Sequence, residues 1–512
     1  MTAFKKVLRE SSGSASSAIE TKQQVEYLDS YFSTIQPATM VVEQEYVDRD
    51  YLEDYSSYYV RCFSSYPRFC KRIHFFSKPF TEEDFFNILR AEASEITIQD
   101  LQDSFLGFIV VKPLPLSVVG RTCLKTFDGN GERFYPINRT YVAHLCGIEL
   151  KVESLAFQEQ DSVAGACATT ALWSAFHATS RKFQHSLPSP FEITKAAASI
   201  RQTAARTFPS SGLTVPEMGQ AIRSVGLEPH VFASSDEITI RSAIYSYLSA
   251  GIPILLAVEL WDTEPPAPVS LGGHAVAITG FGVRTSPAVP MGPTGMLDES
   301  NRINRIYAHD DGLGPFARME LDGKNVVTKR NANDPEEYSL ATTWKNPNNS
   351  KGFIRAVPQI MLVPVYHKIR IPMRKVHNEI TQLDRWIEGF RGIGLLPSLA
   401  ARLNWDIRLS TGNDVKAAIV SSSAISPEIK VKVLTTSLPR FLGKAVACCS
   451  GSTVAEFYFD LTGIDQGVAF LLAIPHNKEF SENLKTLASE PQVEAAISPT
   501  PAWNIFNWFK NC

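Results

Sequence analysis

Between residues 150 and 330 the sequence alternates short apolar strands with helices that have clear termini. Ala168–Ser180 carries apolar side chains three and four positions apart, which is the spacing of one helix face. Thr214 and Glu217 form a capping box that opens a second helix, and a third helix runs from Asp236 to Ala250. Strands are expected at Ile252–Leu260, His274–Val283 and Ile303–His309. This alternation predicts a folded domain that contains both helices and a sheet.

The rest of the 512-residue chain is too long to share one ordinary core with this segment, since domains average about 100–200 residues. The Ser-rich start predicts a flexible tail over residues 1–19, followed by an accessory α/β domain at 20–150. The helix-and-strand segment is placed at 151–330. An Asn-rich polar stretch predicts a linker or loop at 331–351, and a C-terminal α/β domain is expected at 352–512.

Composition narrows the class of protein. Apolar residues make up 44% of the chain and charged residues 20%, which is the balance of a folded soluble protein. The formal net charge is −3 and no large basic block occurs, which argues against a nucleic-acid partner. The longest apolar runs, such as Ile252–Leu260, are far shorter than the ~20 residues that span a bilayer. The first residues lack the apolar stretch of a signal peptide, so a cytoplasmic location without a membrane partner is expected.

One of the eight cysteines lies in a setting that suggests chemistry. The eight are neither dense enough for a disulfide scaffold nor spaced as zinc ligands. Cys167 lies where a loop with Gly165 turns into a helix, and the positive end of a helix dipole stabilises a thiolate. Free backbone N–H groups at this turn, together with the Gln160 side chain, are candidate oxyanion donors. Taken alone, the segment favours an inert buried cysteine at a helix start, because most cysteines are inert.

A histidine and an acidic pair follow later in the chain. His274 opens an apolar strand directly after two glycines, and imidazole is the natural base for a thiol at neutral pH. Asp310 and Asp311 end the next strand, where a carboxylate could orient the imidazole. The alternatives are a histidine satisfied at a strand end and an Asp-Asp-Gly turn without a catalytic role.

The order Gln160, Cys167, His274, Asp310 resembles that of the papain-like cysteine peptidases, and most closely the bacteriocin-processing (double-glycine) peptidases. The resemblance covers residues 150–320 and includes Gly251-Ile-Pro-Ile ahead of the histidine strand. It implies an α+β fold in which an N-terminal helix carries the cysteine and an antiparallel sheet carries the histidine and the acid, with α/β flanking domains. It also implies nucleophile Cys167, base His274, orienting acid Asp310 and oxyanion donor Gln160.

Two positions depart from the family pattern. Ala168 follows the nucleophile where the family usually has Gly, and Asp311 follows the acid where the family usually has Pro, so Asp311 competes with Asp310 for the orienting role. We expect a cysteine protease or isopeptidase with a protein or peptide substrate and neither cofactor nor metal. The same triad would serve a transglutaminase, deamidase or acyltransferase, and a non-catalytic papain-like scaffold is a third interpretation. The flanking domains are expected to control the cleft or to bind a regulatory protein partner.

Overall fold

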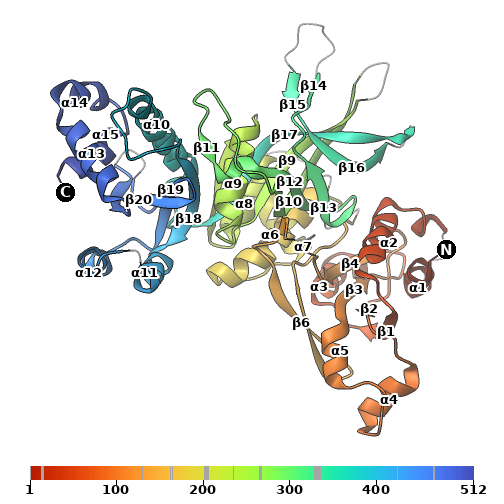
Figure 1. The fold of residues 1–512 in the computed structure, drawn as a ribbon. Coiled ribbons are helices and arrows are strands. Elements are labelled where there is room, and N and C mark those ends of the chain that lie inside the picture. Colours follow the sequence, from red (N-terminus) through yellow and green to blue (C-terminus); the bar gives the residue numbers. More distant parts are fainter. Residues whose placement is uncertain are drawn as a thin grey trace. The chain divides into compact units, whose positions relative to one another are not determined.

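The structure is a computed structural model with a mixed α+β fold (Figure 1). It describes residues 2–511 except 13–16, 128–130, 162, 164, 201–206, 211, 235, 264–267, 328–335, 347–348, 424 and 465–467. The chain divides into two compact units, each assembled from three segments. Unit 1 comprises residues 1–233, 253–282 and 305–364, and unit 2 comprises residues 234–252, 283–304 and 365–512.

A four-stranded antiparallel sheet and a hairpin form the N-terminal part of unit 1. The sheet has the order β1 (Thr39–Tyr46), β2 (Cys70–Phe76), β3 (Phe105–Val111), β4 (Val119–Leu124), and the hairpin pairs β6 (Arg139–Leu145) with β7 (Ile148–Ser154). Every residue of β3 is buried, as expected for a continuous apolar strand in the middle of a sheet. The helices of this part are α1 (Ala3–Ser12), α2 (Gln23–Ile35), α3 (Arg49–Ser57), α4 (Glu82–Arg90) and α5 (Ile98–Ser104).

The second sheet of unit 1 contains eight strands and carries the histidine and the acid. Its order is β12 (Ile303–Asp310), β13 (Gly314–Glu320), β16 (Leu340–Asn346), β17 (Asn349–Tyr366), β9 (Ile254–Asp262), β10 (Val269–Val283), β5 (Arg133–Phe134), with β8 (Leu227–Ala233) paired to β17. Because β12 also pairs with β10, six of these strands close into a ring. A separate two-stranded ribbon joins β14 (Asn325–Val327) to β15 (Glu336–Tyr338).

Three helices pack beside this ring of strands. They are α6 (Cys167–Phe183), α7 (Pro190–Ala198) and α8 (Val215–Ser224), and α6 contacts α7, α8 and β9. Positions 168–179 of α6 are all buried, including the large Trp173 and Phe176 side chains. These side chains share one hydrophobic core with residues of the N-terminal sheet and of β9 and β10. The predicted capping box of Thr214 and Glu217 opens α8, which confirms that helix start.

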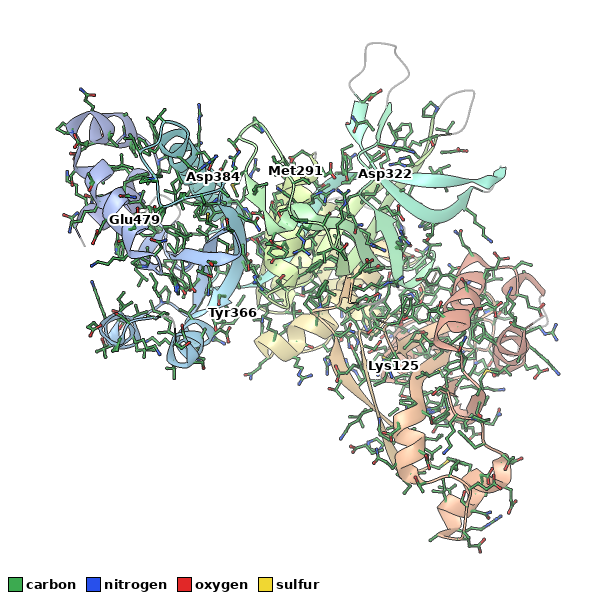
Figure 2. All side chains as sticks on the ribbon, in the orientation of Figure 1. Lys125, Met291, Asp322, Tyr366, Asp384 and Glu479 are labelled. Carbon is green, nitrogen blue, oxygen red and sulfur yellow. The ribbon has the colours of Figure 1, made fainter. Side chains whose placement is uncertain are left out.

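Unit 2 has a five-stranded sheet of its own. The order is β11 (Leu297–Asp298), β18 (Asn404–Thr411), β19 (Phe441–Cys449), β20 (Ser452–Asp460), β21 (Phe470–Pro475), antiparallel except for the first pair. Its helices are α9 (Glu237–Leu248), α10 (Met373–Gly392), α11 (Gly412–Ser421), α12 (Pro427–Thr435), α13 (Lys478–Ser489), α14 (Pro491–Ile497) and α15 (Trp503–Lys510). Figure 2 shows the side chains of both units on the ribbon.

The two units do not follow the domain boundaries expected from the sequence. Residues 20–150 and most of 151–330 belong to one unit with one core, whereas helix α9, from the middle of the expected peptidase segment, belongs to unit 2. The expected tail contains α1, whose Phe4 and Leu8 are buried, and its residues 13–16 lie outside the described residues.

The expected linker at 331–351 contributes β15, β16 and the start of β17, although residues 331–335 and 347–348 lie outside the described part of the chain. The polar composition is misleading here because a strand that buries only one face needs an apolar side chain at only every second position.

Within the part of the chain that the structure describes, no helix combines the length and the apolar character needed to cross a lipid bilayer.

Candidate active site

The candidate nucleophile Cys167 is the first residue of α6, as the sequence predicts. The loop before it is held by Asp161, whose Oδ1 accepts the backbone N–H groups of Val163 (2.8 Å) and Gly165 (3.0 Å). Ala166 occupies the N-cap position and offers no side-chain acceptor to the first turn. The N–H groups of this turn therefore remain available to an anion, and Cys167 is half-buried at the point where they converge.

The strand pairing of β9 and β10 positions His274. Its register partner is Val258 on β9, and its side chain is 8% exposed. The imidazole Nε2 lies 2.9 Å from Oδ1 of Asp310, the last residue of β12. The predicted pair of His274 and Asp310 therefore meets in the folded chain. With Nε2 directed at the carboxylate, Nδ1 is the ring nitrogen left for the thiol.

Asp310 is fully buried and its oxygens are held by several donors. Oδ1 also accepts the backbone N–H of Gly312 at 3.0 Å, and Oδ2 accepts the indole Nε1–H of Trp344 at 2.7 Å. The Trp344 ring lies edge-on to the His274 ring with centroids 5.4 Å apart. A Cβ at Gly312 would come within 2.2 Å of the Trp344 ring, so glycine is needed for this close approach.

Trp344 is the site residue that sequence reasoning missed. It lies on β16, inside the stretch predicted to be a polar linker. The one available signal was the presence of a tryptophan among Asn, Lys and Thr residues, because an aromatic side chain seldom occurs in a solvated linker.

The charges around His274 favour its protonated form. Burial by itself lowers the pKa of the imidazole, but the Asp310 charge, the Asp310 hydrogen bond, hydrogen bonding to the Cys167 side chain and the Asp311 charge together raise that pKa well above its ordinary value. The imidazole is therefore held in a form that can donate a proton beside Cys167.

Asp311 is a second buried carboxyl next to the imidazole. Its Oδ1 is 3.7 Å from His274 Nε2, which is too long for a hydrogen bond, and both carboxyl oxygens lack a hydrogen-bond partner among the described residues. Burial raises the pKa of Asp311 to about 7, against the His274 charge and with a further contribution from Asp310. Of the two competing acids, Asp310 is therefore the one that hydrogen bonds the histidine.

The glutamine predicted as oxyanion donor does not face the same site. Gln160 is exposed and is not among the residues that line the cleft at Cys167. Gln158, two residues earlier on the same loop, is 5% exposed, and its Nε2 has no hydrogen-bond partner among the described residues. Gln158 is likewise not among the residues that line the cleft, so neither glutamine of this loop is placed at the oxyanion position. Spacing alone could not separate two glutamines that lie two positions apart.

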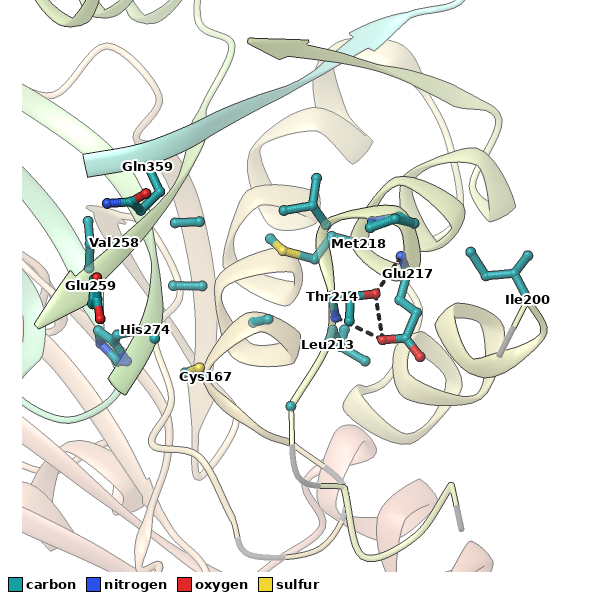
Figure 3. A pocket seen from close by; sticks show the side chains of 17 residues that line it. Cys167, Ile200, Leu213, Thr214, Glu217, Met218, Val258, Glu259, His274 and Gln359 are labelled. Carbon is teal, nitrogen blue, oxygen red and sulfur yellow. Dashed lines mark hydrogen bonds between the residues drawn. The ribbon is translucent and has the colours of Figure 1, made fainter. Parts of the chain in front are cut away.

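A cleft of about 860 Å³ opens at Cys167 and His274 (Figure 3). One side is formed by β9, β10 and the bulge of β17, with Val258, Glu259 and Gln359. The opposite side is formed by the start of α8 and the residues before it, and it includes Leu213 and Met218. All of these residues belong to unit 1. A volume of this size lies within the range of sites that bind small molecules and cofactors.

Ligand atoms of His274, Asp310 and Asp311 also lie within 4.8 Å of one another, so these three groups could hold a metal ion. The 2.9 Å separation of His274 Nε2 and Asp310 Oδ1 is also the length of a direct hydrogen bond between a histidine and the acid that orients it.

No family model matches the chain, and a search of curated proteins finds no similar sequence. The assignment of a function therefore depends on the geometry of the site.

Proposed function

We propose that the protein is a papain-like cysteine hydrolase that cleaves peptide or isopeptide bonds with Cys167 as nucleophile. The observation that carries the proposal is the His274 imidazole, whose Nε2 is bound to buried Asp310 and whose other nitrogen is left for a thiol at a helix start. Trp344 and Gly312 fix the carboxylate, so the imidazole has one orientation.

The proposed reaction has two stages. The Cys167 thiolate attacks the carbonyl carbon, a C–S bond forms, and the oxyanion is stabilised by backbone N–H groups at the start of α6. The C–N bond then breaks as the His274 imidazolium protonates the leaving amine. In the second stage water loses a proton to His274 and attacks the thioester carbon. The C–S bond breaks, the carboxylic acid leaves, and the imidazolium–thiolate pair is restored.

The elements that carry these groups support the papain-like assignment. A buried helix begins with the cysteine, and an antiparallel sheet carries the histidine and the acid on two of its strands, β10 and β12. The cleft lies where this helix and the sheet meet. The same groups would transfer the acyl chain to an amine in place of water. Which of the two is the acyl acceptor is a question for experiment.

The test is selective alkylation of the full chain. Iodoacetamide at pH 6.5, followed by intact mass and peptide mapping, should modify Cys167 at least ~10-fold faster than the exposed Cys146, because only a stabilised thiolate reacts at this pH. His274→Ala should remove this selectivity, while replacement of His144, which lies outside the cleft, should not. Equal modification of Cys167 and Cys146 would refute the catalytic proposal and favour a non-catalytic scaffold.

A further inference from the structure

The charged side chains of the cleft point to a class of substrate, an inference that rests on the proposed function. Apart from His274, the ionisable side chains that line the cleft are Glu217 and Glu259 in addition to the Cys167 thiol. Neither Lys nor Arg occurs among the described lining residues. The described walls therefore offer a negative charge to whatever binds beside the nucleophile.

The carboxylate of Glu217 already makes hydrogen bonds at the start of α8. It is 6% exposed, and its Oε2 accepts the backbone N–H of Thr214 at 2.8 Å and the Thr214 hydroxyl at 2.9 Å. These are the bonds of a capping box, which hold the start of the helix. Glu217 therefore has little capacity to bind a substrate.

Glu259 is in a different position. It lies on β9 opposite Gly273 of β10, and Figure 3 shows it on the same side of the cleft as His274. Its side chain is half-buried, and its Oε1 accepts a hydrogen bond from the hydroxyl of Ser270. No Lys, Arg or His of the described chain forms an ion pair with it, so a partly desolvated negative charge faces the cleft.

The opposite side of the cleft is apolar. Leu213, Val215 and Met218 line it, and Ile200 lies farther along the same wall. A substrate that fits both sides carries a cation near one wall and an aliphatic or aromatic side chain near the other. A carboxylate in such a cleft discriminates in favour of a cation because the pairing is stronger where water is excluded.

We propose that Glu259 selects peptide substrates that carry a lysine or arginine side chain next to an apolar residue beside the scissile bond. The cation pairs with the free carboxylate oxygen of Glu259, and the apolar neighbour packs against Leu213 and Met218. Glu259 is thus a specificity-determining residue of the cleft.

The test uses two matched pairs of peptidyl chloromethyl ketones that alkylate the nucleophile. In each pair one probe carries arginine and the other carries citrulline, which has the same shape without the charge. The substituted residue is the last residue of the peptide in one pair and the penultimate residue in the other pair. Attack by Cys167 forms a C–S bond and releases chloride, so intact mass gives the rate. We expect the arginine probe of at least one pair to react on the order of 10- to 100-fold faster.

Glu259→Gln keeps an acceptor for Ser270 and should bring the arginine and citrulline rates to within about twofold of each other. Glu92→Gln, an exposed change outside the cleft, should leave the preference intact and so exclude an effect of net charge. Equal rates in the wild type, or a preference that persists in Glu259→Gln, would overturn the inference while iodoacetamide labelling of Cys167 still upheld the hydrolase. Failure of Cys167 to react selectively with iodoacetamide would refute both.

Discussion

Asp310 and Asp311 are neighbours in the sequence but differ in their hydrogen-bond partners, and this difference predicts which of them controls the reactivity of Cys167. Asp310 makes hydrogen bonds to His274, Gly312 and Trp344, whereas the oxygens of Asp311 have no such partners among the described residues. We expect Asp310→Ala to slow alkylation of Cys167 by on the order of 10²-fold, because the imidazole loses its orienting acceptor. Asp311→Ala should slow it by less than about tenfold. A larger loss for Asp311→Ala would make Asp311 the orienting acid.

The raised pKa of Asp311 also predicts a dependence of stability on pH. A carboxyl with a pKa of about 7 in the folded state and about 4 in the unfolded chain takes up a proton on folding at intermediate pH. Its burial therefore lowers the free energy of unfolding progressively as the pH rises from 4 to 7, and has no such effect below pH 4. His274, Asp310 and Glu159 are the charged groups that face it, and they remain in Asp311→Asn. We expect this variant to be more stable than the wild type by about 4 kcal/mol at pH 8 and to differ from it by less than about 0.5 kcal/mol at pH 4.

The measurement is urea unfolding at both pH values, with Asp103→Asn as the matched control. Asp103 is exposed, so its replacement should change the free energy of unfolding equally little at pH 4 and pH 8. A stability difference for Asp311→Asn that is the same at both pH values would contradict the buried, protonated state of Asp311.

At the scale of elements, strand β16 takes part in the site through one indole. Trp344→Phe keeps a ring beside His274 but removes the 2.7 Å hydrogen bond to Asp310, and a bond to a charged group contributes about 1.5–3 kcal/mol. We expect this change to slow Cys167 alkylation about tenfold. Trp261→Phe is the matched control, since that indole lies on the same sheet and its buried Nε1 has no hydrogen-bond partner among the described residues. Equal effects of the two changes would indicate general loosening of the sheet.

At the scale of the whole molecule, the site draws on parts of the chain that lie far outside the segment recognised from its sequence. Gln24 Nε2 of α2 donates to the Asp311 carbonyl at 3.2 Å, and the Tyr27 hydroxyl donates to the Pro315 carbonyl at 2.8 Å. The Tyr27 ring also packs where a Cβ on Gly314 would be 2.2 Å away. The N-terminal flank therefore supports the turn that carries the acids.

A fragment of residues 150–330 should consequently fail to form the site. It lacks α2 as well as β16 and β17, which are two of the six strands in the ring. We expect the fragment to unfold without a cooperative transition and to lose selective alkylation of Cys167, because its apolar strands would have exposed edges. Circular dichroism melting and mass spectrometry check both points. A stable monomeric fragment that reacts like the full chain would show that the flanks are dispensable.

The local features of this protein follow from its sequence. The helix starts at Thr214 and Asp236 were predictable because a cap depends on residues within one turn of each other. The glycine-containing loop before Cys167 and the apolar spacing after it predicted that this residue opens a helix, and the apolar run before Asp310 predicted that it ends a strand.

The tertiary structure alone decided which distant groups meet. Trp344 reaches Asp310 through strand pairing across a polar stretch, and burial distinguishes Gln158 from Gln160. Helix α9 joins unit 2 although the sequence on both sides of it builds unit 1. Such outcomes depend on contacts between segments far apart in the chain. The free energy that stabilises these contacts comes from apolar burial and strand pairing between segments, so no single segment determines it.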